Sequence, residues 1–420
     1  MKISIQNQVR IALLYFLIAA SLGLLLRFWH VFDIDVNYKF VKHGHSHIAL
    51  LGWVYLCLTT VFYALFVKQD TKIQSRYSWG FVATQLTLVG MLVTFPVQGY
   101  AFLSITFSTL FLFASYWFTW FFLKNVKPEI KALVCFPYIK ASLYYLVVSS
   151  IGPWALGGIM ATLGPTSIWY RLAIYFYLHF QYNGWMILAV LGILLFFMER
   201  GGITLSRKRT SEVHDQRESA ALKRNKNIFI IINLSVVFTT LLSALWTEPI
   251  KLVYGLSALG GLLQLACFVY ALIWLKKNKN ILKSLFSSLQ WFLFKTVIVV
   301  LSVKLLLQFF GSLPYFANLS TNIIELTIAY LHWVFLGVIS LSLLLILNAS
   351  KLLELNRKHL YFYLIGFLTT EGLLIYKGIA IWSKASRVSE YYNEYLLAAS
   401  GLLFTSIITL TLKKPNKISK

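Results

Sequence analysis

Residues 43–67 read HGHSHIALLGWVYLCLTTVFYALFV, a stretch without aspartate, glutamate, lysine or arginine that begins with three histidines. A helix of about 20 apolar residues is long enough to cross the ~30 Å hydrocarbon core of a bilayer. The stretch therefore predicts a membrane span with His43, His45 and His47 in its first turns. Because an ionisable side chain inside a bilayer is costly, its presence there indicates a functional site.

The composition of the whole chain is that of a polytopic membrane protein. The 420 residues are 59% hydrophobic and 12% charged, whereas soluble domains carry about 25% charged residues. We expect a single all-α integral membrane domain over residues 1–420, built as a twelve-transmembrane-helix bundle. The expected spans are 10–33, 43–67, 77–97, 100–123, 138–163, 168–198, 227–246, 252–275, 285–310, 321–348, 359–382 and 391–412.

The positive charges give the predicted orientation. The net charge is +24, but the lysines and arginines gather in alternate loops, above all in the basic loop 199–226 between spans 6 and 7. Cytoplasmic loops carry such an excess, so we expect this loop and both termini in the cytoplasm. The pattern indicates a multi-pass protein of the bacterial inner membrane whose partner is the lipid bilayer, with no nucleic acid.

Four histidines share one depth band in this topology. Spans 2, 6 and 10 begin at the outer face, with His43 and His47 in the first turns of span 2. His179 and His332 each lie about twelve residues into a span, which is ~18 Å at 1.5 Å per residue. Residues four apart share a helix face, so His43 and His47 point one way and His45 roughly the opposite way. Only one of these two sets is expected to face the bundle interior.

Further ionisable residues lie within the predicted spans. We expect Lys295 and Lys304 in span 9 to extend to the interface or to pair with a buried carboxylate such as Glu371. Glu325 precedes His332 by seven residues, or about two turns, and so lies on nearly the same face.

These residues resemble the catalytic subunit of the haem-copper oxidase superfamily, which includes the nitric oxide reductases. That family has twelve spans and carries haem- or metal-ligating histidines in spans 2, 6 and 10, where this chain also has histidines. The three similar motifs are His43-Gly44-His45-Ser46-His47 in span 2, His179-Phe180-Gln181-Tyr182-Asn183-Gly184 in span 6 and His332 followed by Gly337 in span 10. The start of span 2 is also similar to NnrS-like membrane proteins, which are linked to nitric oxide tolerance and to haem or metal binding.

The chain departs from the family pattern at three places. Asn183 replaces the glutamate of the reductase motif, and Tyr330 stands where the family has the first histidine of its span 10 pair. Span 7, where the family has two adjacent histidines, contains none. The resemblance therefore implies a degenerate, non-oxidase relative whose distal copper or iron site is incomplete.

The resemblance implies one haem b between spans 2 and 10, ligated by His332 and by His43 or His47. Lys384 and Arg387, between spans 11 and 12, would bind the haem propionates. A second metal, copper or iron, would have His45, His179 and Asn183 as its candidate ligands. Such a protein would serve electron transfer, or a response to nitric oxide, haem or metal, rather than dioxygen reduction. Its partners would be other respiratory-chain subunits or a cytochrome donor.

Other functions are open on the sequence alone. A metal or small-molecule transporter would use the histidines as ion ligands. An accessory or assembly subunit of a respiratory complex would keep them as structural residues. If the chain is an enzyme, the resemblance implies an oxidoreductase of the haem-copper oxidase or nitric oxide reductase type.

Overall fold

The computed structural model describes residues 3–202, 212–385 and 388–412, and these residues form helices with no strand beyond one isolated bridge between Val67 and Val126. Twelve of the helices in the described residues are long and apolar enough to cross a membrane, and each coincides with a predicted span. The prediction of an all-α, twelve-helix membrane protein is confirmed. The observed spans are Ile5–Phe28, Tyr38–Phe66, Thr71–Gln98, Phe102–Asn125, Cys135–Thr162, Ile168–Arg200, Lys223–Thr247, Lys251–Lys277, Ser288–Phe310, Ile324–Ala349, Arg357–Trp382 and Tyr392–Thr411.

The chain divides into two compact units, which are described separately. The first unit comprises Met1–Lys127 and Glu325–Lys420, and the second comprises Pro128–Ile324.

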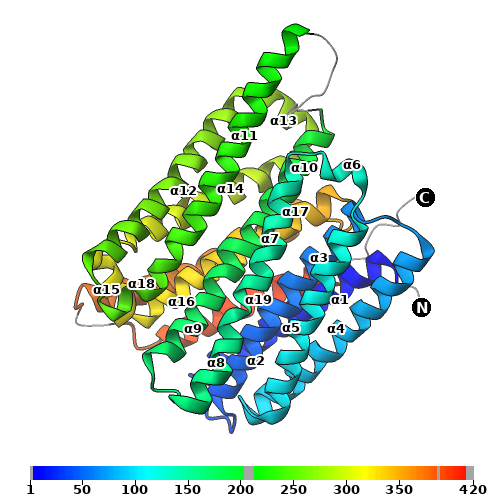
Figure 1. The fold of residues 1–420 in the computed structure, drawn as a ribbon. Coiled ribbons are helices and arrows are strands. Elements are labelled where there is room, and N and C mark those ends of the chain that lie inside the picture. The colour runs from blue at the N-terminus through cyan, green and yellow to red at the C-terminus, as the bar shows by residue number, and fades with distance from the viewer. Residues whose placement is uncertain (1–2, 203–211, 386–387, 413–420) are drawn as a thin grey trace. The chain divides into compact units, whose positions relative to one another are not determined.

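In the first unit, α18 and α19 lie side by side, α19 also packs along α1, and α4 packs along α5 (Figure 1). Its elements are α1 (Ile5–Phe28), α2 (Tyr38–His47), η1 (Ile48–Tyr55), α3 (Leu56–Phe66), α4 (Thr71–Gln98), α5 (Phe102–Asn125), α16 (Ile324–His332), η4 (Trp333–Ser340), α17 (Leu341–Ala349), α18 (Arg357–Trp382) and α19 (Tyr392–Thr411).

In the second unit, α11 packs along α12, α8 along α9, and α7 along α10 (Figure 1). Its elements are α6 (Pro128–Lys131), α7 (Cys135–Ser149), α8 (Ile151–Thr162), α9 (Ile168–His179), η2 (Phe180–Met186), α10 (Ile187–Arg200), α11 (Glu212–Thr239), η3 (Thr240–Thr247), α12 (Lys251–Lys277), α13 (Lys279–Leu285), α14 (Ser288–Phe310) and α15 (Pro314–Asn322).

Polar side chains at the helix ends satisfy backbone groups that a helix leaves unpaired. The Asp70 carboxylate accepts hydrogen bonds from the Lys72 and Ile73 amides at the start of α4. The Glu199 carboxylate accepts from the Val134 and Cys135 amides at 2.9 and 3.0 Å, which caps α7. Such caps fix where a helix begins, and an acidic group at that end also opposes the positive pole of the helix dipole.

Burial distinguishes the central spans from those that face outward. In span 2, 83% of the most apolar window is buried, compared with 17% for α12. In the first unit the Trp53 indole donates a hydrogen bond of 2.9 Å to Ser340 Oγ, and its ring stacks on Phe16 with centroids 4.6 Å apart. Spans 1, 2 and 10 are therefore held together at the core of this unit.

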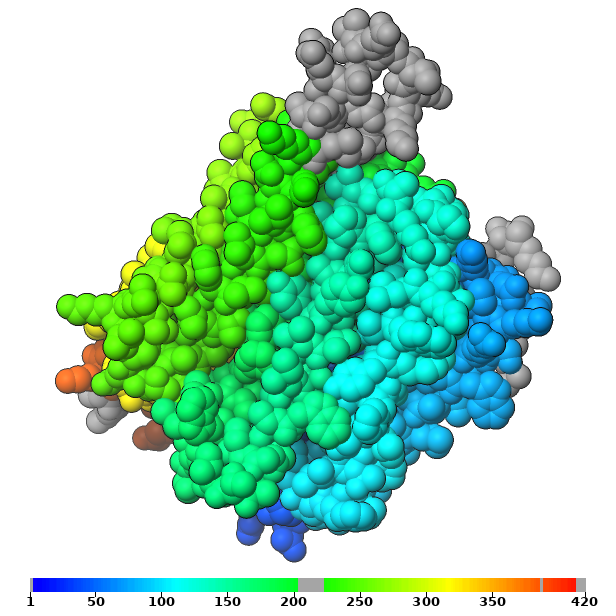
Figure 2. Space-filling view, in the orientation of Figure 1, coloured from blue at the N-terminus to red at the C-terminus, as the bar shows by residue number. Residues whose placement is uncertain are grey.

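The outward helices present apolar side chains to their surroundings. The exposed side chains of α12 include Leu252, Leu259, Leu262, Val269 and Ile273. Figure 2 shows α11 and α12, in green, at the surface. These apolar side chains are removed from water only when lipid surrounds the helices. We therefore expect this surface to contact the bilayer.

Candidate functional site

Three histidines are each followed directly by a π-helical segment. His47 precedes η1, His179 precedes η2 and His332 precedes η4. Segments of this kind are rare, and they occur frequently at functional sites. In the sequence each of these histidines has a glycine five residues later, at Gly52, Gly184 and Gly337. Gly184 and Gly337 belong to the motifs described above, whereas the same spacing from His47 to Gly52 was not recognised from the sequence.

The three glycines allow an aromatic ring from a neighbouring helix to approach the backbone. A Cβ at Gly52 would lie 2.8 Å from Tyr15, one at Gly184 would lie 2.7 Å from Tyr145, and one at Gly337 would lie 2.8 Å from Phe367. Real Cβ atoms almost never come so close to another heavy atom. Each π-helical segment is therefore fixed against a neighbour, and so is the histidine that precedes it.

His45 faces α1 in the first unit. Its Nδ1 lies 2.8 Å from the Ala19 carbonyl oxygen, and its ring packs against Gly23, where a Cβ would lie 3.0 Å from the imidazole. Because a carbonyl oxygen only accepts, Nδ1 carries the proton and Nε2 keeps its lone pair. Nε2 is therefore the nitrogen of His45 that has a lone pair to offer.

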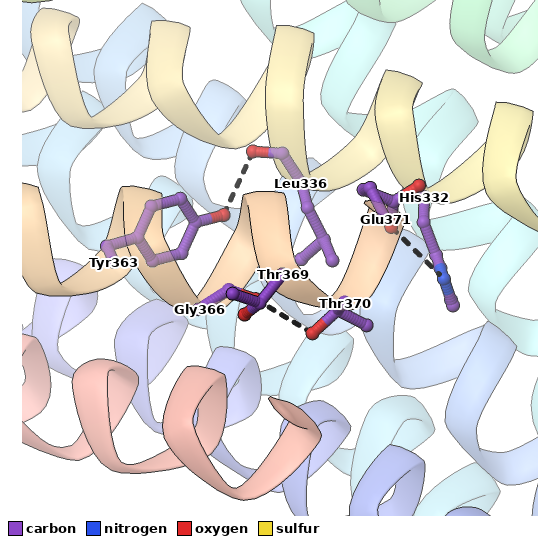
Figure 3. A network of polar contacts seen from close by, with 7 residues as sticks. All are labelled: His332, Leu336, Tyr363, Gly366, Thr369, Thr370 and Glu371. Atoms are coloured by element: carbon purple, nitrogen blue, oxygen red, sulfur yellow. Dashed lines mark hydrogen bonds and ion pairs between the residues drawn. The ribbon is translucent and has the colours of Figure 1, made fainter. Parts of the chain in front are cut away.

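His332 faces the buried carboxylate of Glu371. The Nδ1 atom of His332, on α16, lies 3.6 Å from Oε1 of Glu371, on α18 (Figure 3). Glu371 is only 1% exposed, and both of its carboxylate oxygens lack a hydrogen-bond partner within the described residues. The Tyr363 hydroxyl donates to the Leu336 carbonyl at 2.9 Å, which fixes α18 against η4 beside this pair (Figure 3). The carboxylate and the imidazole form a polar pair inside an apolar bundle.

Arg27 on α1 and His45 on α2 lie within electrostatic range of this pair, and a second pair of charged groups joins α16 to α18. Arg27, near the end of α1, interacts electrostatically with Glu371 and with the imidazoles of His45 and His332. His45 and His332 also interact with each other. Lys377 forms an ion pair of 3.0 Å with Glu325. We call the set Arg27, His45, Glu325, His332, Glu371 and Lys377 the outer cluster.

His43 and His47 lie on the other face of α2, as the spacing predicts. The His47 ring stacks on Phe95 with centroids 4.2 Å apart, and the His43 ring lies edge-on to Tyr100 at 4.6 Å. His47 Nδ1 lies 2.9 Å from the His43 carbonyl oxygen. These contacts direct both rings toward the end of α4, whereas His45 lies in the electrostatic neighbourhood of His332.

Of the two basic residues predicted to bind propionates, the structure describes only Lys384, and no described contact brings it into the outer cluster. Lys384 is exposed in the turn after α18, with a φ of 51°. Arg387 lies outside the described residues, as does part of the basic loop 199–226. Arg27 and Lys377 are the described cations within the cluster, and the sequence analysis did not assign them a role.

In the second unit, His179 and Asn183 belong to a buried chain of hydrogen bonds. His179 Nε2 lies 2.9 Å from the Val236 carbonyl oxygen, and its Nδ1 accepts from the Asn183 amide at 3.2 Å. The Asn183 oxygen accepts from Lys304 at 2.5 Å, and Lys304 also donates to Gln308. Both ring nitrogens of His179 are thus engaged, so a metal would have to displace one of these partners.

The expectation that Lys304 extends to the interface or pairs with a carboxylate is wrong. Its side chain is buried, with the residue 1% exposed, and its hydrogen-bond acceptors are the amide oxygens of Asn183 and Gln308. The chain continues from Gln308 to Gln264 at 2.9 Å. Amide groups supply both acceptors and donors, which lets one buried amine be satisfied without an anion.

Comparison with known proteins does not assign a function. No protein-family model matches the chain, and no curated protein matches it. The geometry of the outer cluster is therefore the basis for a functional assignment.

The outer cluster has the chemistry of a paired imidazole site. Within the described residues no group of three or more histidine, cysteine, aspartate or glutamate side chains is placed to hold a metal ion. Two imidazoles are nevertheless enough for a haem iron, whose other four ligands come from the porphyrin. His45 and His332, on spans 2 and 10, are the two imidazoles of the outer cluster.

Proposed function

We propose that the protein is a haem-binding redox protein of the membrane, with His45 and His332 as the two axial ligands of one b-type haem. One observation carries the proposal: these imidazoles, from spans 2 and 10, lie within electrostatic range of each other, beside the buried carboxyl group of Glu371. The pair replaces the one expected from the sequence, in which His43 or His47 was the partner of His332.

The surroundings of both imidazoles fit this role. A metal-ligating histidine usually directs its other ring nitrogen to a backbone carbonyl or a carboxylate, which orients the ring. Ala19 offers the carbonyl to His45, and Glu371 is the carboxylate that Nδ1 of His332 faces. Neither carboxyl oxygen of Glu371 has a hydrogen-bond partner among the described residues, so Glu371 is available to accept a hydrogen bond from that nitrogen.

The cations of the cluster fit the acidic groups of a haem. Haem propionates are anions, and arginine or lysine side chains compensate such charges best where water is scarce. Arg27 interacts electrostatically with Glu371, while Lys377, on the same helix as Glu371, pairs with Glu325, on the same helix as His332. We assign them the role that the sequence analysis gave to Lys384 and Arg387.

A haem iron with two imidazole ligands has no open position, which favours electron transfer over dioxygen reduction. Both ring nitrogens of His179 are engaged in hydrogen bonds, so His179 has no free nitrogen for a second metal. We therefore propose electron transfer, or a response to nitric oxide or haem, in the bacterial inner membrane. A cytochrome donor or another respiratory-chain subunit would be the redox partner.

A metal or small-molecule transporter is the second candidate function. It is favoured by Glu371, a buried carboxylate without a hydrogen-bond partner among the described residues, which is a suitable ligand for a passing cation. Such a protein would bind an ion at Glu371 and His332 with no porphyrin.

The test is to purify the chain in detergent from cells with ample haem, then record the reduced-minus-oxidised spectrum and the metal content. We expect a Soret band, an α band and one iron for each haem. Bound zinc or copper without these bands would favour the transporter. The absence of both haem and metal would reject the two candidates together.

A further inference from the structure

A groove runs along the seam between α4 and α5 in the first unit. Its volume is about 1010 Å³, and aromatic side chains form much of its wall. Trp79 and Phe113 on its rim are 61% and 53% exposed. The ring of Trp117 lies across Gly80, where an added Cβ would lie 2.0 Å from it. Because Gly80 has no side chain, the Trp117 ring can form the floor of the groove.

One end of the groove is basic. Arg76, in the second turn of α4, and Lys124, at the end of α5, both line it, and both are exposed. The Lys124 ammonium lies over the Trp120 ring, 4.9 Å from its centroid. No lining residue is acidic, so an anion at this end would meet two uncompensated cations.

The lining of the groove extends ~17 Å along α4, from Arg76 to Thr87, and ~27 Å along α5, from Phe107 to Asn125, at 1.5 Å per residue. Both lengths exceed half of the ~30 Å hydrocarbon core, so the groove is long enough for an acyl chain that starts at its basic end. The basic end lies at the ends of both helices, which is the side that the charge distribution predicts to be cytoplasmic. Exposed tryptophans such as Trp79 and Trp120 are typical of that interface.

We infer that this groove binds an anionic glycerophospholipid, with the phosphate at Arg76 and Lys124 and an acyl chain along the aromatic wall. A lipid fits better than a helix of another protein, because the cations occur only at the end where a headgroup would lie. Basic pockets between transmembrane helices on the cytoplasmic side bind such headgroups. The site does not depend on the proposed haem.

Native mass spectrometry of the detergent-purified full chain tests the charge requirement. The probes are phosphatidylglycerol and phosphatidylcholine of the same acyl composition. We expect the wild type to retain phosphatidylglycerol preferentially, and each of R76Q and K124Q to weaken its retention about fivefold, since each cation near a membrane surface contributes ~1 kcal/mol. The matched control is K276Q/K277Q, which removes two exposed cations at the end of α12 and should change retention by less than twofold.

A second measurement locates the acyl chain. In vesicles, phosphatidylglycerol brominated on the acyl chain should quench tryptophan fluorescence more strongly in the wild type than in A83F, in which a bulky ring fills the groove without adding a tryptophan. Equal retention of the two lipids by the wild type would overturn the inference. So would equal losses in the control and groove variants, or unchanged relative quenching in A83F.

Discussion

Because α18 packs closely against α19, we expect alanine substitutions at two glycines of α18 to differ in their effect on stability. At Gly366 an added Cβ would lie 2.7 Å from the Leu403 Cα and 2.8 Å from the Leu403 nitrogen, whereas at Gly372 nothing lies within 4 Å. Backbone atoms of α19 cannot rotate away as a side-chain tip can. We therefore expect Gly366→Ala to separate the two helices and Gly372→Ala to be accommodated.

The magnitudes follow from two opposing effects. Forcing an extra carbon into a packed site costs about 1–3 kcal/mol, while replacing glycine by alanine within a helix gains up to about 1 kcal/mol. The gain applies to both variants, so it cancels in their comparison. We expect Gly366→Ala to be less stable than Gly372→Ala by about 1–3 kcal/mol.

The assay is thermal unfolding in detergent, followed by tryptophan fluorescence, with the wild type and both variants measured side by side. The apparent midpoint of Gly366→Ala should lie several degrees below that of the wild type, and that of Gly372→Ala at or above it. Midpoints that agree between the two variants, or that fall in the reverse order, would refute the close approach of α18 and α19.

Three further predictions concern the outer cluster and the buried hydrogen-bond chain of His179, Asn183 and Lys304. His179→Gln should leave a haem spectrum unchanged, because the proposed ligands lie in the other unit; loss of the bands would place haem at His179 instead. Glu371→Gln should retain haem but raise its midpoint potential in a redox titration, because the carboxyl group that faces the His332 imidazole and would raise its basicity as a ligand is lost; an unchanged or lowered potential would contradict this. Asn183→Leu should destabilise the protein by about 3–5 kcal/mol, because it removes an acceptor from the buried Lys304. Adding Lys304→Met should recover part of that loss in a double-mutant cycle, and strictly additive effects would argue against the contact.

The spans could be predicted from the sequence because a bilayer imposes a length that local composition reveals. A run such as residues 43–67 needs no knowledge of its neighbours to be assigned as a span. The opposite directions of His45 and of His43 with His47 were also predictable, since they follow from helical periodicity alone.

The choice between those two faces was not predictable in the same way. It depends on which helix lies beside α2, and the Ala19 carbonyl that meets His45 is 26 positions away in the chain. The engagement of Lys304 by Asn183 is likewise long-range, over 121 positions. The π-helical segments were missed because an apolar run has no period that separates them from α-helix, although the repeated His-to-Gly spacing of five residues was available.

The most direct test of the proposed haem site is the haem content for each chain in four single variants, measured by the pyridine haemochrome method on equal amounts of folded protein. We expect His45→Ala and His332→Ala to lose most of the haem, while His43→Ala and His47→Ala retain it, because the rings of His43 and His47 face Phe95 and Tyr100. Loss of haem in His43→Ala or His47→Ala with retention in His45→Ala would contradict the assignment of His45 and return the ligand to the other face of α2.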